Sequence, residues 1–384
     1  MEHTINVGID LGTTNSVIAK FNKGEVTVYK NPVSWKDTTP SVVSFRKDKI
    51  LVGQKAKEYL EKSPQNVVSN FKRKMGTNET FKIKALNKSV TPVELSAHVL
   101  KELKTFVQTD EPMDAAVITI PASFDTVQAH ATDETGHLAG FKQVILLQEP
   151  IAASLAYANK IKNLKDGQWI VYDLGGGTFD VALVKITEGE MRILDHEGDN
   201  FLGGTDFDRL IVEKSIIPFL EKNYAFENLK SEMESASGRY NNKYYAALHR
   251  AETAKIELSA RTSAEIDGFF MNDDNDEECE VVVEITRSEF EAYIKEYVDK
   301  TIDMIRKIMT RNSLTSNDIQ FVLMVGGSTY IPYVRNRVKE MLQIPLSCDE
   351  LDPTTAIAVG AAYFAGTKNR DIEKPTTPQK AQPK

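Results

Sequence analysis

The sequence predicts an α/β protein built from two similar lobes. Two segments share one order of features: a hydrophobic strand, the tripeptide Asp-Leu-Gly, a second strand, a Gly-Glu turn and a third strand. The first copy begins at Ile5 and the second at Trp169. Their aspartates, Asp10 and Asp173, lie 163 residues apart. A repeat of this kind indicates a duplicated unit. Helical patterns fall between the strands, which is typical of the α/β class.

Start signals justify the helices in turn. Residues 91–94 (Thr-Pro-Val-Glu) combine a capping box with proline at the first helical position, and an apolar face follows. Glu149-Pro150 opens a short helix that is expected to run to residue 156. A second capping box at 286–289 opens a long helix with apolar positions up to residue 308. The last helix, near 353–365, is expected to return to the first lobe.

Residues 205–284 predict a largely helical insertion that ends in a hairpin, with 264–271 paired to 281–285. The acidic loop that begins at Asp273 has oxygen-bearing side chains at the offsets of a calcium-binding loop. However, Glu278 stands where such a loop needs glycine, and no helices flank it. We therefore interpret the loop as a solvated acidic turn.

Composition narrows the classes of function. A length of 384 residues suggests two or three domains, and 47 basic against 55 acidic residues give a net charge of −8. This balance argues against nucleic acid or an anionic membrane as a partner. No apolar run approaches the ~18 residues that span a bilayer. Two cysteines exclude a disulfide scaffold, and the polar start at Met1 argues against a signal peptide, so a cytoplasmic location is expected. The chain is expected to be a monomer.

Three turns rich in glycine and hydroxyl groups carry the chemistry. They occupy residues 12–14, 175–178 and 326–329, and each follows a hydrophobic strand. Glycine lets backbone N–H groups approach phosphate oxygens because no Cβ intervenes. One such turn alone is as readily a tight hairpin. Three of them, two at repeated positions beside an aspartate, predict a nucleotide site, although no Walker, kinase or Rossmann motif is present.

Acidic residues next to these turns predict a cation. Asp10 and Asp173 end strands at the first two turns, and Asp180 starts the return strand of the second copy. Carboxylates beside phosphates repel them unless a cation lies between, and Mg²⁺ accepts one or two carboxylates together with phosphate oxygens and waters. Glu149 precedes a proline at a helix start, so it either joins this group or only caps the helix.

A family resemblance rests on seven motifs in order. They lie at residues 10–16, 148–154, 173–181, 198–208, 252–259, 325–332 and 359–362. Together they resemble the ATPase domain of the seventy-kilodalton heat-shock chaperones, the DnaK type, over about residues 4–366. The resemblance implies a duplicated actin-like (ribonuclease H-like) ATPase fold, with two lobes around a central nucleotide cleft.

The resemblance also implies boundaries. Lobe I would comprise residues 1–162 and 348–366, with an inserted subdomain at about 36–92. Lobe II would comprise 163–347, with an insertion at about 205–287. Residues 367–384, which hold five cations, two acids and three prolines, are expected to form a disordered tail or linker.

Residue roles follow from the resemblance. The catalytic set would be Lys72, Glu149, Asp173, Thr178 and Asp180, and Asp10 and Asp173 would hold Mg²⁺ mainly through waters. The nucleotide would be bound by Gly12, Thr13, Thr14, Asn15, Gly175, Gly176, Gly177, Gly203, Gly204, Glu252, Lys255, Ser259, Gly326, Gly327, Ser328 and Tyr330. ATP or ADP with Mg²⁺ is the implied cofactor, with K⁺ as an optional ion. Taken alone, Lys72 would read as a surface lysine in a basic run.

Three positions depart from the family pattern. Tyr330 replaces an arginine that packs on adenine, and its ring can stack as well. Ala129 and Asp133 replace cations associated with signalling between domains. The segment 367–384 contains no leucine where the family has a leucine-rich linker. The changes at Ala129 and Asp133 and the leucine-free segment put interdomain coupling in doubt, though not hydrolysis.

The expected function is Mg-dependent binding and slow hydrolysis of ATP, whose nucleotide state would control a peptide-binding domain that lies outside this sequence. A J-domain co-chaperone and a nucleotide-exchange factor are the implied partners. The main alternative is a divergent actin-superfamily ATPase with a scaffold or filament role and no peptide clients. A small-molecule kinase and a nucleotide sensor without hydrolysis remain further alternatives.

Overall fold

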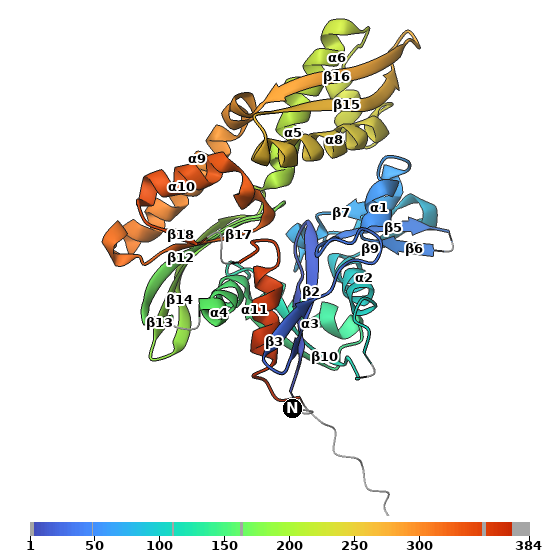
Figure 1. Ribbon diagram of the computed structural model, residues 1–384. Helices are drawn as coiled ribbons and strands as arrows, with labels where there is room; N and C mark the ends of the chain where they lie inside the picture. Colours follow the sequence, from blue (N-terminus) through green and yellow to red (C-terminus); the bar gives the residue numbers. More distant parts are fainter. Residues whose placement is uncertain (1–3, 48, 110, 162–163, 348–350, 371–384) are drawn as a thin grey trace, which may run out of the picture.

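Two β-sheets flank a central pair of helices, α4 (Glu149–Ile161) and α11 (Ala356–Ala365) (Figure 1). The computed structural model describes residues 4–370 except 48, 110, 162–163 and 348–350. The arrangement confirms the α/β class and the actin-like duplication. The predicted junctions between lobes, 162/163 and 347/348, fall at residues outside the described part, so these boundaries stay predictions.

The first sheet has the order β11-β10-β1-β2-β3, with β4 paired to β2. Strands β1, β2 and β3 are antiparallel neighbours, while β10 and β11 run parallel to β1. The strands are β1 (Val7–Asp10), β2 (Asn15–Asn22), β3 (Glu25–Val28), β4 (Thr39–Pro40), β10 (Ala115–Ile120) and β11 (Gln143–Gln148).

The second sheet repeats this plan in the order β14-β13-β12-β17-β18. Its first three strands form an antiparallel meander, and β17 and β18 run parallel to β12. Asp10 ends β1 and Asp173 lies near the end of β12, so the repeated aspartates occupy matching places. The strands are β12 (Gly167–Leu174), β13 (Phe179–Thr187), β14 (Glu190–Asp199), β17 (Val322–Val325) and β18 (Leu346–Ser347).

Each sheet carries an insertion. The first contains a three-stranded sheet and a small hairpin: β5 (Val42–Arg46), β6 (Lys49–Val52), α1 (Gln54–Tyr59), η1 (Pro64–Asn66), β7 (Val67–Ser69), η2 (Phe71–Lys74), β8 (Phe81–Ile83), η3 (Lys84–Leu86) and β9 (Lys88–Val90). The second is mostly helical: α5 (Gly204–Ile211), the π-helix η4 (Val212–Ile216), α6 (Ile217–Asn223), α7 (Leu229–Glu234), α8 (Asn241–Ala260), β15 (Ser263–Asn272) and β16 (Glu278–Thr286).

The predicted hairpin of the second insertion is confirmed, with β15 antiparallel to β16. In its loop, Asp273 Oδ1 accepts hydrogen bonds from the backbone N–H groups of Asn275 (2.9 Å) and Glu277 (3.0 Å). A side chain that closes its own turn in this way is a common turn device. The acidic loop therefore has a structural use for Asp273.

Helix starts follow the predicted signals. Thr91 Oγ1 accepts from Glu94 N–H at 3.1 Å while Glu94 Oε2 accepts from Thr91 N–H at 2.7 Å, and Thr286 and Glu289 repeat this capping box. Helix α4 runs to Ile161, beyond the expected end at residue 156. The remaining helices are α2 (Pro92–Lys104), α3 (Thr126–Leu138), α9 (Arg287–Arg311), η5 (Ser316–Asp318), η6 (Gly327–Tyr330) and α10 (Pro332–Leu342).

One apolar core joins the two sheets at their base. Val117 of β10 and Trp169 of β12 belong to it, together with small residues of α4 and α11. A Cβ on Gly8 would overlap the backbone of Ala362, and a Cβ on Gly360 would overlap the carbonyl oxygen of Ala152. These glycines therefore let α11 lie directly on β1 and α4.

Residues 367–370 pack against the first sheet. The N–H of Ile5 donates to Lys368 O at 2.9 Å, Thr4 bridges to Asn369, and Arg370 Nε donates to Asp114 Oδ1 at 2.8 Å. These contacts correct the expectation for the first four residues of the tail, which are packed rather than loose. Residues 371–384 lie outside the described residues. Across the described chain, no helix has the length and apolar character that a membrane span needs.

Candidate functional site

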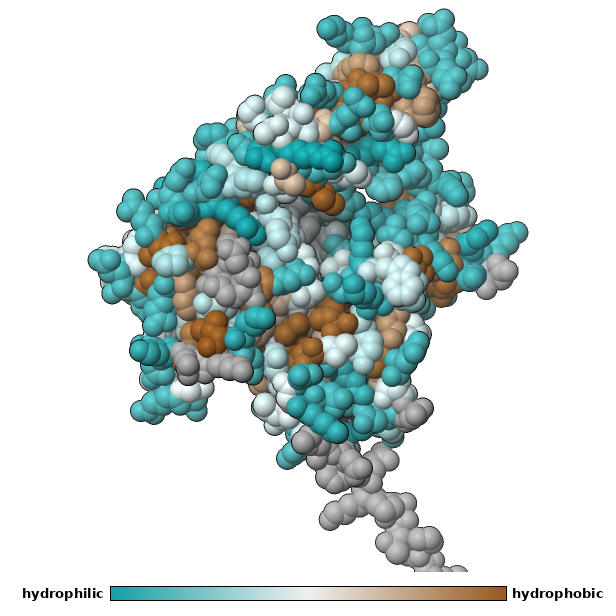
Figure 2. All heavy atoms as spheres, viewed as in Figure 1, coloured by the Kyte–Doolittle hydropathy of each residue, from teal (hydrophilic) through white to brown (hydrophobic). Residues whose placement is uncertain are grey.

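A cavity of about 230 Å³ lies between the two lobes. In Figure 2 the face shown is hollowed between the upper helical insertion and the part that contains α1. Residues far apart in the sequence line this cavity, from both sheets and from α8. The predicted site residues among them are Asp10, Gly12, Thr13, Thr14, Asn15, Lys72, Glu149, Asp173, Gly175, Gly176, Gly177, Thr178, Glu252, Lys255, Ser259, Gly326, Gly327 and Ser328.

The first two glycine turns contact each other, and both line the cavity. A Cβ on Gly176 would stand 2.6 Å from Thr14 Oγ1, and one on Gly177 would stand 2.5 Å from Thr13 Cγ2. Neither position leaves room for a side chain, so bare backbone faces the cavity. Thr14 Oγ1 is buried and finds no hydrogen-bond partner within the described chain. A buried hydroxyl of this kind fits a site that a polar ligand completes.

Two further glycine segments are tied to the second turn. Ser328 Oγ donates to Gly175 O at 2.9 Å, and the N–H of Gly204 donates to the same oxygen at 3.0 Å. Gly326 has φ +85°, a conformation that favours glycine, and its Cβ would overlap Leu174 O. The result is a cradle of backbone groups built from both lobes, which suits phosphate oxygens.

Lys72 is buried and paired with Glu149. Its Nζ donates to Glu149 Oε1 at 2.9 Å, and the two residues are 5% and 8% exposed. Lys72 is therefore not a surface lysine, and Glu149 does more than start α4. Burial alone would lower the pKa of Lys72, but Glu149 and Asp10 raise it by more, so the ammonium stays charged.

The aspartates near Lys72 carry more negative charge than it can balance. Burial, together with Glu149, raises the pKa of Asp10 to about 7, and the same two causes raise that of Asp180 to about 7. The pKa of Asp173 is also raised, first by burial and then by Glu149 and Asp180. Several carboxylates around one lysine fit a divalent cation that supplies the missing positive charge.

The donor set fits Mg²⁺ held largely by water. Among the described residues, no three His, Cys, Asp or Glu side chains lie close enough together to enclose a metal ion. Mg²⁺ keeps several waters and takes only one or two protein carboxylates. Asp10 also accepts from Thr119 Oγ1 at 3.3 Å, and Asp180 from Ser123 Oγ at 3.0 Å, so both carboxylates are oriented.

The raised pKa of Asp180 predicts a pH dependence of stability. Its carboxyl holds a proton in the folded protein up to about pH 7, whereas an unfolded aspartate loses it near pH 4. The folded state then binds more protons, so its contribution to stability falls as pH rises through this window. We expect the apo protein to lose free energy of unfolding between about pH 4 and about pH 7 more steeply than the Asp180→Asn variant, measured by urea unfolding. Equal slopes would contradict this assignment.

The opposite end of the cavity is built by α8. Lys255 Nζ donates to Gly204 O at 2.9 Å and pairs with Asp208 Oδ1 at 2.8 Å. Burial, opposed by Lys255, raises the pKa of Asp208 to about 6. Ile256 is exposed and also lines this end. A charged and hydroxyl-bearing edge beside an apolar wall suits a sugar and a flat base.

Several predicted residues do not line the cavity, namely Asp180, Gly203, Gly204 and Tyr330. Asp180 is buried and accepts from Ser123 Oγ, and the two glycines contribute backbone that packs on the second turn. Tyr330 donates its hydroxyl to Asp352 Oδ1 at 3.1 Å, and the Arg335 guanidinium lies over its ring at 5.3 Å. The roles of these four, like those of the lining residues, stay predictions.

Some lining residues were missed from the sequence: Val17, Thr38, Thr205, Asp208, Ile331, Pro353, Thr354 and Ile357. Thr205 and Asp208 lie within the motif at 198–208, so their spacing from Gly204 could have indicated them. The others carry no local signal, since isolated threonine, proline and aliphatic residues are common everywhere. Only the fold brings them to the cavity.

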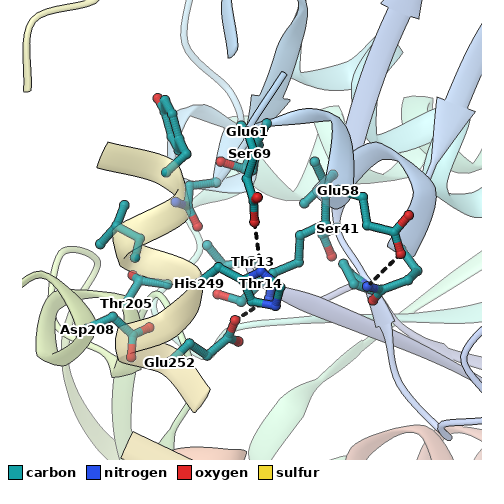
Figure 3. A pocket seen from close by; sticks show the side chains of 18 residues that line it. Thr13, Thr14, Ser41, Glu58, Glu61, Ser69, Thr205, Asp208, His249 and Glu252 are labelled. Carbon is teal, nitrogen blue, oxygen red and sulfur yellow. Dashed lines mark hydrogen bonds and ion pairs between the residues drawn. The ribbon is translucent and has the colours of Figure 1, made fainter. Parts of the chain in front are cut away.

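A second cavity of about 160 Å³ adjoins the first between α1 and α8. Two contacts span it: an ion pair of Lys57 with Glu252, and a hydrogen bond between His249 Nδ1 and Glu61 Oε1 at 2.8 Å (Figure 3). Figure 3 shows Glu61 and His249 pointing toward each other from the two insertions. These contacts connect the two insertions next to the glycine cradle.

The fold and the first cavity, of about 230 Å³, define an actin-like domain with its site between two duplicated lobes. A family model described as Hsp70 protein matches residues 6–374, and the chain belongs to the Hsp70 family.

This chain is similar to bacterial proteins named DnaK. The chain is 39% identical over 371 residues to the chaperone protein DnaK of Mycoplasma mobile, which covers 95% of this chain and 59% of that protein. It is 38% identical over 369 residues to the DnaK of Mycoplasmopsis synoviae, with the same two coverages. It is 38% identical over 359 residues to the DnaK of Metamycoplasma hominis, covering 93% and 58%. The chain thus spans less than two thirds of the length of these relatives.

Proposed function

We propose that this chain is a Mg-dependent ATP-binding and slowly ATP-hydrolysing domain of a DnaK-type chaperone. The observation that carries the proposal is the buried Lys72–Glu149 pair, which lines the same cavity as Asp10, Asp173 and the glycine cradle. Phosphoryl transfer to water depends on positioning and charge neutralisation rather than on a strong base. These residues supply both. Membership of the Hsp70 family supports the same reaction.

Each part of the site has a distinct task. Bound Mg-ATP supplies the phosphoryl group. The backbone of the glycine turns binds phosphate oxygens, and Lys72 places a fixed positive charge beside them in a water-poor site, where it is most effective. Glu149 holds Lys72 in place, and Asp10 and Asp173 would hold Mg²⁺ mainly through its waters. Glu252, Lys255 and Ser259 bind the ribose and adenine end.

The chaperone role of the whole protein is part of the proposal. Relatives named DnaK extend well beyond the matched region, so a peptide-binding domain, a J-domain co-chaperone, a nucleotide-exchange factor and a cytoplasmic location are all inferred. Ala129 and Asp133 lie on α3, where Asp133 pairs with His137 at 3.5 Å. With no cation at either position, we propose that coupling to a peptide-binding domain differs from the family pattern.

Phosphate release from ATP, without any added acceptor, tests the reaction. We expect slow turnover in the parent and a loss of about 10²-fold in Asp173→Asn, which removes one charge at the metal. A parent that binds ATP tightly but releases no phosphate would contradict the hydrolase assignment and leave a nucleotide sensor. Sedimentation at rising protein concentration with ATP separates the filament alternative, because only that alternative predicts large assemblies.

A further inference from the structure

Arg73 connects the two lobes at the phosphate turns. It lies beside Lys72 in η2, and only 14% of its side chain is exposed. Its Nε donates to the carbonyl oxygen of Gly177 at 2.9 Å, and its Nη2 donates to the same oxygen. Nη2 also lies 3.3 Å from Asp206 Oδ2, and the guanidinium stacks over the Phe201 ring at 5.5 Å. One side chain of the first insertion thus makes four contacts with the second lobe.

The bond to Gly177 fixes one peptide plane. The peptide unit is planar and trans, so the N–H of Thr178 points away from the carbonyl that Arg73 holds. Thr178 lines the cavity, and both it and Lys72 also line a small adjoining cavity of about 10 Å³ together with Arg73. Arg73 therefore holds the second glycine turn on the side where Lys72 also lies.

The contact with Asp206 fixes a second segment. Asp206 is buried, and its Oδ2 accepts from the N–H of Gly203 at 2.9 Å. In the same segment, the N–H of Thr205 donates to Gly176 O at 2.7 Å. Arg73 thereby holds two of the glycine segments of the second lobe, at Gly177 and, through Asp206, at Gly203. Lysine cannot reproduce this, because it lacks the planar fork that donates in two directions.

We propose that Arg73 is a positioning residue that sets the second phosphate turn for the terminal phosphate of a nucleoside triphosphate. The inference rests on the proposed function and adds a reason for preferring ATP over ADP. A turn held open or closed by Arg73 affects the terminal phosphate most, because Gly177 and Thr178 lie beside Lys72. Within the described chain, the contacts of Arg73 are with Gly177, Asp206 and Phe201 and not with the residues proposed for the ribose and adenine end.

The test compares Arg73→Ala, Arg73→Lys and Lys74→Ala with the parent. Lys74 is the matched control, since it is the next residue of η2 and its one ion pair among the described residues is with Glu79, at 2.6 Å on the surface. ATP and ADP affinities are measured by titration calorimetry, and kcat and KM by phosphate release. We expect Arg73→Ala to weaken ATP about tenfold and ADP less than about twofold, with kcat reduced about tenfold or more. Arg73→Lys should restore part of the ATP preference, and Lys74→Ala should match the parent.

The outcomes separate the two claims. An Arg73→Ala protein with the parent's ratio of ATP to ADP affinity overturns the Arg73 inference alone. Equal losses for both nucleotides, with a lower melting temperature, assign Arg73 a merely structural role and also overturn it. If Arg73→Ala does not fold, the affinity ratio of Arg73→Lys decides in the same way. A parent that binds neither nucleotide overturns the proposed function instead.

Discussion

Replacing Lys72 with alanine should abolish most ATP turnover while the protein still binds ADP. We expect a loss of about 10²–10³-fold in kcat, comparable to removing one fixed charge from a preorganised site. The reason is geometric as well as electrostatic, because Lys72 Nζ is buried and held by Glu149 at 2.9 Å, so water cannot replace it at the same place. Single-turnover phosphate release under saturating Mg-ATP measures the effect.

Controls separate catalysis from folding for this variant. Loss of Lys72 leaves Glu149 buried without its cation, which costs about 3 kcal/mol for a broken buried pair. The double variant Lys72→Ala with Glu149→Gln should therefore regain stability but not turnover. Lys74→Ala on the same 3₁₀ helix should hydrolyse ATP like the parent. Turnover of Lys72→Ala within about threefold of the parent would remove Lys72 from the site.

Gly360→Ala should destabilise the protein by about 3 kcal/mol or more, at the upper end for an overpacked core. The new Cβ would overlap the carbonyl oxygen of Ala152, and both α4 and α11 are backbone-rigid elements that cannot yield by rotating a side chain. Both helices belong to the core that joins the lobes. Urea unfolding followed by circular dichroism measures the loss.

A matched glycine tests whether space is the cause. The Cβ of Gly327→Ala would meet only Thr354 Cγ2, at an ordinary 3.7 Å, so its free energy of unfolding should stay within about 1 kcal/mol of the parent. If Gly360→Ala proved as stable as Gly327→Ala, the close approach of α11 to α4 would not be a strict requirement of the fold.

Local signals made much of the fold predictable. The duplication was visible because both copies keep Asp-Leu-Gly between two strands, and the structure gives both sheets the same strand order. Capping boxes at Thr91 and Thr286 marked helix starts because their hydrogen bonds are made within four residues. The end of α4 was missed, since nothing in the sequence after Ala156 breaks a helix before residue 161.

The site was predictable where its chemistry is written in motifs. Glycine turns and strand-end aspartates form recognisable local motifs, whereas Lys72 could be identified only through the family resemblance. Asp206 and Arg73 illustrate what the sequence cannot show, because their contact joins residues 133 positions apart and depends on how two insertions meet. The packing of residues 367–370 was likewise not predictable, since it depends on contacts with Thr4 and Asp114, which are far away in the sequence.

The core shared by both sheets determines how a ligand can enter. Because α4 contacts strands of both sheets and α11 packs on α4, the lobes cannot part at their base without exposing Trp169 and its neighbours. We therefore expect any opening of the cavity to be a rotation about this base, with the largest displacement at the opposite rim. At that rim lie the ion pair of Lys57 with Glu252 and the hydrogen bond between Glu61 and His249. Partly exposed pairs contribute only about 0–1 kcal/mol each, so the molecule can open and reclose readily while its core stays intact.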